Sequence, residues 1–549
     1  MADATFDAVI VGGGTNSLVT AIYLAKYGKM SVGVFEERHE LGGGLGSHDA
    51  PAPGFIGNTH ASTLRYWYYT PVRDDFPDFE EKGGKLAHYP VGRAIICKED
   101  HSCFTNYHSE VDPTGEKTYR ELVRFAGERD ADTYMKIRRE IREHLFQGLI
   151  EEACNLPPPP GQPTPKERVF HEYMKKPDCP IDRRWLGLSA YQAAHELFDH
   201  GGLLYMVLRE LVAFACSADL STGSNLLSQI CFSSDLWFGV GGTHSIAHAY
   251  QRLLVENGGR FFTKSKVEKI LIENGRAKGV RLADGTEIEA RKVVVSGVDP
   301  HQLCFNLIGR DYLSDKILRK VAALLRYWTA TITWYTWAMH EQPNYKAAAF
   351  NPDINNAHWT MLGCKDPDVL LREGLWRRLN VDPPEDAIVC WAHHSLVDPT
   401  QAPEGKHTLS TEELAVPAFA HTEEGWMKFK RDHADKTIQV LHEYAPNLTW
   451  DSVIGYDPIT PFDVATRTKN MAPAGNFGVI DRVMGQNYPN VPITEFASYR
   501  LPIGGLYGTG TSWGNSGGTG LSWPGYTCYK AIADDLGLAK PWVDKGRTF

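Results

Sequence analysis

A glycine-rich turn near the N-terminus is the first place where residue types and spacing indicate chemistry. The apolar run Phe6–Val11 leads directly into Gly12, Gly14 and Ser17, the positions of a GxGxxG turn with serine in place of the third glycine. Glu36 ends the next apolar run, where such units carry the acid that binds ribose hydroxyls. Phosphate can approach a glycine backbone closely, and a helix N-terminus stabilises its charge. The pattern predicts a dinucleotide site.

The elements that must hold this turn follow from hydrophobic periodicity. Leu18–Ala25 has helical spacing and Gly28 ends the helix, while Ser31–Phe35 is typical of a buried strand. Farther along, the runs 267–272, 279–282 and 292–297 are separated by Asn-Gly and Asp-Gly turns, which predicts a three-stranded meander. We expect an α/β nucleotide-binding domain around the glycine turn.

Three segments resemble, in the same order, the FAD-binding segments of amine-oxidase and phytoene-desaturase flavoproteins. Glu36–Gly44 is similar to their ExRxxxGG continuation, and Gly239 to Gly297 is similar to their central segment. The stretch 499–520 resembles the closing motif YRTPIxGLYLxGxxxHPGGGxxGAxGxNAA, which also occurs in the pyridine nucleotide-disulphide oxidoreductase-like branch. Ser512–Asn515 replaces the His-Pro of that motif, so the family's substrate is not carried over.

The resemblance implies the fold and the cofactor. We expect a Rossmann-type, glutathione-reductase-like FAD-binding domain with an inserted α+β substrate domain on a mixed sheet, and FAD bound noncovalently. The FAD domain would comprise 1–84, 231–300 and 471–549, and the substrate domain 85–230 and 301–470. From spacing alone either Glu36 or Glu37 can bind ribose, and the family register favours Glu36. The implied FAD-binding residues are Gly12, Gly14, Thr15, Asn16, Ser17, Glu36, Glu37, Arg38, Gly43, Gly44, Val267, Gly297, Gly510, Thr511, Gly518 and Thr519.

The candidate catalytic residues are His60, Arg65, Trp513 and Tyr526. His60 falls where family members bring the chain back toward the flavin ring. It is a candidate proton donor, covalent flavin anchor or structural hydrogen-bonding residue, of which we favour the structural role. Trp513 would shape a pocket that differs from the family's. An aromatic run, Tyr327–Trp337, predicts a strand with Trp328, Ile332 and Trp334 on one face, either in the core or walling a pocket.

The expected activity is FAD-dependent oxidation or desaturation of an apolar isoprenoid-, alicyclic- or aromatic-like small molecule, with hydride transferred to flavin. The alternatives are a redox-neutral flavin-dependent isomerase or hydratase, and a non-catalytic flavin-binding partner protein. No second strand-GxGxxG-helix unit occurs, so NAD(P)H is not expected as a tightly bound cofactor or hydride source. Oxygen, a quinone or a carrier protein would then accept the electrons.

Length, net charge and residue counts limit the domain number, the partners and the location that we expect. A chain of 549 residues exceeds one core and predicts at least two domains. The net charge of −10 argues against a nucleic-acid partner. The 10 cysteines lack paired spacing, which is typical of a reducing, cytoplasmic location. His244 and His248 lack the Glu of HExxH, so no metal is expected. No signal peptide or membrane span is recognisable, and peripheral membrane contact and homo-oligomers remain open.

Overall fold

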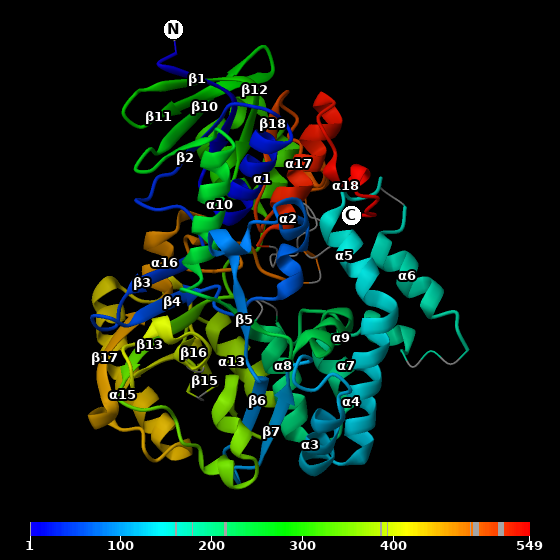
Figure 1. Ribbon diagram of the computed structural model, residues 1–549, viewed down its shortest axis with the longest axis vertical. Helices are drawn as coiled ribbons and strands as arrows, with labels where there is room; N and C mark the ends of the chain where they lie inside the picture. Colours follow the sequence, from blue (N-terminus) through cyan, green and yellow to red (C-terminus); the bar gives the residue numbers. More distant parts are fainter. Residues whose placement is uncertain are drawn as a thin grey trace.

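The computed structural model describes residues 2–159, 162–177, 179, 181–213, 217–384, 387–391, 394–483, 485–486, 493–513 and 521–549. Two large sheets organise the chain, one near the N-terminus at the top of Figure 1 and one toward the bottom of that view. In the described parts of the chain, no helix has the length and apolar character that a membrane crossing needs.

The first sheet is 7-stranded and follows the order β10-β11-β12-β1-β2-β9, with β18 paired to β12. Strands β1, β2, β9, β12 and β18 run parallel, while β10, β11 and β12 form an antiparallel meander. The meander confirms the prediction from the central turns. The strand bounds are β1 Ala4–Val11, β2 Val32–Phe35, β9 Arg260–Phe262, β10 Val267–Glu273, β11 Arg276–Leu282, β12 Glu287–Ser296 and β18 Leu506–Gly508.

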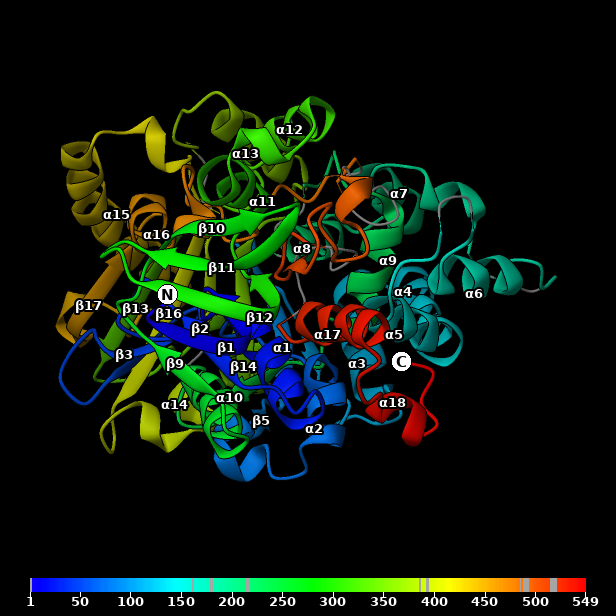
Figure 2. The same ribbon diagram turned by 90° about the horizontal axis from the view of Figure 1, so that it is seen from above.

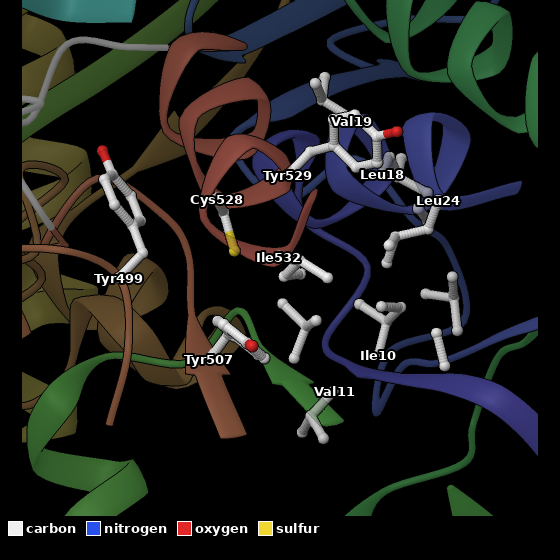
Figure 3. Packing of buried hydrophobic residues seen from close by; sticks show 14 of the residues in the cluster. Ile10, Val11, Leu18, Val19, Leu24, Tyr499, Tyr507, Cys528, Tyr529 and Ile532 are labelled. Carbon is white, nitrogen blue, oxygen red and sulfur yellow. The ribbon is translucent and has the colours of Figure 1, made fainter. Parts of the chain in front are cut away.

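Helix α1 (Thr15–Lys26) follows β1 and packs against α17 (Trp523–Leu536) beside this sheet (Figures 2 and 3). Figure 3 shows side chains of β1, α1 and α17 meeting in one apolar core. Gly525 permits the close approach of the two helices, because a Cβ there would lie 2.2 Å from the Asn16 carbonyl oxygen. Thr20 Oγ1 donates a hydrogen bond to the Gly525 carbonyl at 2.9 Å. The C-terminal helix therefore fixes the helix that starts at the glycine turn.

The second sheet is also 7-stranded, in the order β17-β13-β16-β15-β14-β6-β7. It is mixed, because β14 and β6 are parallel and the other pairs are antiparallel. With the first sheet it confirms the expected fold class. The strand bounds are β6 Val91–Cys97, β7 Cys103–Tyr107, β13 Ile332–Met339, β14 Ala357–Gly363, β15 Val389–Trp391, β16 His407–Leu414 and β17 Val453–Ile459.

Helices cover both faces of the second sheet (Figure 1). Strand β13 begins at Ile332, so Trp328 precedes it, and Ile332 and Trp334 share the predicted face, toward α8. Tyr335 and Trp337 face α15 on the opposite side. The helices on the α8 side are α3 Glu116–Ala126, α4 Glu128–Glu140, α7 Ala190–Leu197, α8 Gly201–Ala213 and α9 Gly223–Phe232, and α15 spans Glu423–Tyr444.

Two segments that the sequence analysis places in the substrate domain contribute side chains to the core of the first sheet. The segment after residue 300 continues through α12 (Asp315–Ala322), and its apolar side chains, such as Leu307 and Val321, join the core of the first sheet. Helix α5 (Phe146–Cys154) contributes Ile150 and Cys154 to the same core. These helices bury their apolar faces against the nearest sheet, which the order of segments along the chain does not reveal. The other helices are α2 Thr70–Asp75, α6 Pro165–Tyr173, α10 His244–Glu256, α11 Pro300–Gln302, α13 Asp368–Arg378, α14 His394–Val397, α16 Pro461–Arg467 and α18 Pro541–Asp544.

Candidate functional site

A cavity of about 530 Å³ lies at the carboxyl ends of β1, β2 and β12. In open α/β sheets this end of the strands is where ligands bind. Its lining includes Gly12, Gly14, Glu36, Glu37, Arg38, Gly43, Val267 and Gly297, together with residues 466–470. The cavity therefore gathers predicted residues from the N-terminal and central segments.

The glycine turn leaves room for a ligand at Gly14 and packs closely against its neighbours at Ser17. Gly12 has a φ of +84°, which favours glycine. A Cβ on Gly14 would meet no atom within 4 Å, so this position faces open space. Gly14 is the N-cap of α1 and makes no side-chain capping bond. A Cβ on Gly297 would lie 2.0 Å from Ser17 Oγ, so the third position of the turn packs tightly against the end of β12.

Glu36 is held across the glycine turn. Its carboxylate accepts the Gly13 N–H at 2.7 Å and the Arg38 N–H at 2.8 Å. Arg38 pairs with Glu40 and donates to the Gly43 carbonyl at 3.3 Å. Glu37 lies instead at the exposed rim, 3.9 Å from the Lys266 ammonium. The two adjacent acids thus have different surroundings, and only Glu36 is tied to the turn.

A second cavity of about 210 Å³ continues from the first. Gly14, Gly43, Gly297, Thr468 and Asn470 line both cavities, so the N-terminus of α1 stands between them. The second cavity extends to the other sheet. Its further lining residues include Thr15, Asn16, Ser17, Gly44, His60, Tyr68, Ala213, Ile332, Trp359, Glu412, Phe477, Arg482, Gly510, Thr511 and Leu521.

This arrangement fits FAD. An extended dinucleotide needs space on both sides of its diphosphate, and the open Gly14 position and the helix N-terminus lie where the two cavities join. Glu36 and Val267 lie on the side of the first cavity, whereas His60 and Thr511 lie on the side of the second. Gly518 and Thr519 lie outside the described residues.

His60 ends the hairpin formed by β3 (Leu45–Asp49) and β4 (Ile56–His60). Its φ of +69° is unusual for a residue with a side chain and stores strain at the cavity. Burial lowers its pKa to about 3, and the charges of Arg467 and Arg38 contribute. His60 is therefore neutral near pH 7, and among the described residues Nδ1 has no hydrogen-bond partner. A low pKa opposes a proton-donor role, because that role requires imidazolium at working pH.

The other catalytic candidates lie elsewhere among the described residues. The Arg65 guanidinium donates to Gln229 at 3.0 Å and stands 5.3 Å from the Phe232 ring. Trp513 is buried and donates from Nε1 to the Val298 carbonyl at 3.0 Å. Tyr526 packs against Tyr23 between α17 and α1, with ring centroids 5.3 Å apart. None of Arg65, Trp513 and Tyr526 is among the described residues that line the two cavities.

Residues 466–470 were missed by the sequence reasoning, which assigned them to the substrate domain. Asn470 Nδ2 donates to the Gly297 carbonyl at 3.0 Å, and Arg467 pairs with Glu40 at 3.1 Å. The last residues of α16 and the three residues that follow it therefore reach the dinucleotide cavity. Nothing in their sequence resembles a glycine turn, so the position of α16 brings them there.

No metal centre emerges from the predicted histidine pair. His244 Nδ1 contacts the Leu45 carbonyl at 2.7 Å, and the rings of His244 and His248 meet edge to face. Within the described residues, no group of three or more His, Cys, Asp or Glu side chains is arranged to hold a metal ion. The described cysteines are all free thiols.

The chain is similar to known proteins in sequence and in fold. A family model for an NAD(P)-binding Rossmann-like domain matches residues 10–79. The chain is 25% identical to one of the polypeptides of limonene dehydrogenase from Castellaniella defragrans, over 98% of this chain and 96% of that protein. It is 26% identical to pyridine nucleotide-disulfide oxidoreductase domain-containing protein 2 of Rattus norvegicus, over 93% and 91%.

Among solved structures, putrescine oxidase bound to putrescine has a TM-score of 0.58 at 13% identity, covering 97% of this chain and 99% of that one. The likeness at this identity shows a shared fold. In its motifs and its relatives the chain resembles phytoene desaturase-like, FAD-dependent oxidoreductases.

Proposed function

We propose that the protein oxidises or desaturates an apolar small molecule by transferring hydride from a substrate carbon to FAD. The observation that carries the proposal is the composition of the second cavity where it reaches the other sheet. Trp359 and Ile332 come from that sheet, and Tyr68 and Phe477 add aromatic surface. An apolar wall with few polar groups is typical of a site for an apolar ligand.

Each part of the chain has a distinct task in this proposal. Bound FAD supplies the hydride acceptor. The α1 N-terminus and Gly14 bind the diphosphate, while the second sheet excludes water and orients the substrate by shape. A hydrocarbon offers no hydrogen bonds, so contact with Trp359 and its neighbours must hold the reacting carbon in place. The limonene named for one relative is an apolar molecule of the proposed class.

His60 is proposed as a positioning residue at the flavin side of the cavity. A neutral imidazole can accept a hydrogen bond at Nδ1, which is buried and has no partner within the described part of the chain. This role uses the strained backbone conformation to aim the ring. Arg65, Trp513 and Tyr526 are proposed to support the surrounding core, because each packs against buried aromatic side chains.

Electrons are proposed to leave reduced FAD to oxygen, a quinone or a carrier protein. The glycine turn of β1 and α1 faces the cavity assigned to FAD, so it is not free for NAD(P)H. Rapid mixing of oxidised protein with NADH and NADPH tests this part. Fast loss of the oxidised flavin absorbance with either nucleotide would contradict it.

The main experiment is anaerobic mixing of FAD-loaded protein with a panel of isoprenoid, alicyclic and aromatic hydrocarbons. We expect at least one to bleach the oxidised flavin and to yield a product with two fewer hydrogens, identified by mass spectrometry. An unchanged flavin spectrum across the panel would oppose the proposal. Turnover of substrate without any electron acceptor would instead favour a redox-neutral isomerase or hydratase.

A further inference from the structure

A buried carboxylate lines the second cavity beside apolar side chains of the second sheet. Glu412, on β16, lines the cavity with Ile332 and Trp359 and is only 3% exposed. It pairs in register with Trp334 of β13, on the sheet face that packs against α8. A buried carboxylate is costly to desolvate, so the position of Glu412 beside apolar side chains requires an explanation.

Arg209 of α8 holds this carboxylate from behind. Its guanidinium lies 3.4 Å from Glu412 Oε1 and donates to the Ala387 carbonyl at 3.3 Å. Arg209 is fully buried and is absent from the described cavity lining, whereas Ala213, one helical turn later, lines the cavity. The geometry thus points Glu412 between the arginine and the cavity.

A second buried ion pair lies next to the first. Glu210, the residue after Arg209, lies 3.4 Å from Arg93 on β6. The Arg93 guanidinium stands 3.7 Å over the ring of Trp359. Both the carboxylate and the tryptophan of the cavity wall are therefore backed by an arginine. Apolar residues of similar volume often replace buried ion pairs without loss of stability, so stability alone does not account for the arrangement.

We propose that Glu412, positioned by Arg209, accepts a hydrogen bond from a hydroxyl group on an otherwise apolar substrate. This inference rests on the proposed function and narrows its substrate class. The Arg209 cation offsets the charge of Glu412, and Arg482 adds a further cation to the cavity lining, which disfavours an ammonium ligand. A carboxylate ligand placed against Glu412 would bring two hydrogen-bond acceptors together with no donor between them. A neutral donor therefore suits the site best.

The test compares four molecules on one skeleton, namely cyclohexylmethanol, methylcyclohexane, cyclohexylmethylamine and cyclohexanecarboxylic acid. Their affinities for the FAD-loaded protein are measured by calorimetric titration, which does not depend on turnover. A hydrogen bond to a charged acceptor predicts about tenfold tighter binding of the alcohol than of the hydrocarbon. Tightest binding of the amine or the acid would overturn the inference.

Variants assign the preference to Glu412. Replacing both partners in E412L/R209M removes the ion pair without leaving a buried charge, and the preference for the alcohol should disappear. R209K keeps a cation beside Glu412 and should retain most of the preference for the alcohol. The matched control is E413Q, because Glu413 is the next residue on β16 and pairs with His433 at 3.2 Å. It should bind the four molecules like the wild type.

The outcomes separate this inference from the proposed function. Equal binding of alcohol and hydrocarbon would overturn the role of Glu412 and leave the proposed apolar site intact. An alcohol preference that persists in E412L/R209M would also overturn it. If none of the four molecules binds to the wild-type protein, the proposed apolar site fails and the inference fails with it.

Discussion

The surface of the dinucleotide cavity is formed mainly by backbone, whereas the wall that the second sheet contributes is formed by side chains. Around the α1 N-terminus, backbone carries the site, because Gly12, Gly14 and Gly297 bring main chain close to the ligand space. At the far end of the second cavity, side chains such as Trp359 and Glu412 define the surface. A backbone site depends on the absence of side chains, whereas a side-chain site depends on which ones are present.

This contrast predicts different sensitivities. Adding a side chain to the glycine turn should destroy FAD binding without altering the fold. Changing a side chain of the sheet wall should alter substrate binding and leave FAD in place. Substitutions in each region therefore test whether the two cavities serve separate purposes.

The largest effect is expected for Gly14→Leu. Its side chain would enter the open space at the junction of the cavities, so the purified protein should contain no FAD and should not bind added FAD. Fluorescence and absorbance titrations measure this directly. Gly374→Leu is the matched control, because a Cβ there also meets no atom within 4 Å but the residue lies on α13, away from the cavity lining.

A smaller loss is expected for Glu36→Ala. Removing a carboxylate that accepts two backbone N–H groups should weaken FAD binding at least about tenfold, in line with charged hydrogen bonds. Glu37→Ala is the control, because its carboxylate pairs with Lys266 at the rim. Binding constants for FAD decide between the two acids, and a greater loss in Glu37→Ala would reverse the assignment.

Trp359→Phe probes the side-chain wall. Phenylalanine offers less apolar surface to the cavity than the indole does, so substrate binding should weaken by about 1 kcal/mol and the KM for an apolar substrate should rise about fivefold. The dissociation constant of FAD should not change. A large loss of FAD affinity in this variant would show that the two cavities cannot be treated as separate sites.

The smallest effect near pH 7 is expected for His60, whose contribution to stability appears only at lower pH. The pKa of His60 falls from 6.5 to about 3 on folding, so the unfolded chain binds a proton that the folded protein lacks, and stability falls as pH drops from 6.5 toward 3. His60→Asn should flatten this slope by up to about 1.4 kcal/mol per pH unit in denaturant titrations. Asparagine tolerates the left-handed backbone.

His394→Asn provides the comparison for that experiment. Burial lowers the pKa of His394 to about 3 as well, but its ring stacks on Phe238 and does not line the cavity. Both variants should flatten the slope, whereas FAD loading should change only the contribution of His60. An equal response of the two variants to FAD would place the cofactor away from His60.

The sequence by itself determined the backbone-built part of the protein. Gly12, Gly14 and Glu36 could be identified because a glycine turn, the helix after it and the acid at the next strand end are local in sequence and obey fixed spacing. The meander of β10 to β12 could be predicted for the same reason, since its turns carry Asn-Gly and Asp-Gly.

Only the tertiary structure decided the side-chain-built part. Glu412, Arg209 and Trp359 lie on β16, α8 and β14, and no local pattern distinguishes them from other sheet and helix residues. Asn470 reaches Gly297 only after the chain has folded across from α16. Trp513 and Tyr526 were candidate catalytic residues from the sequence, but they pack in the core. Side chains acquire a role at a cavity through long-range packing, and sequence spacing does not encode that packing.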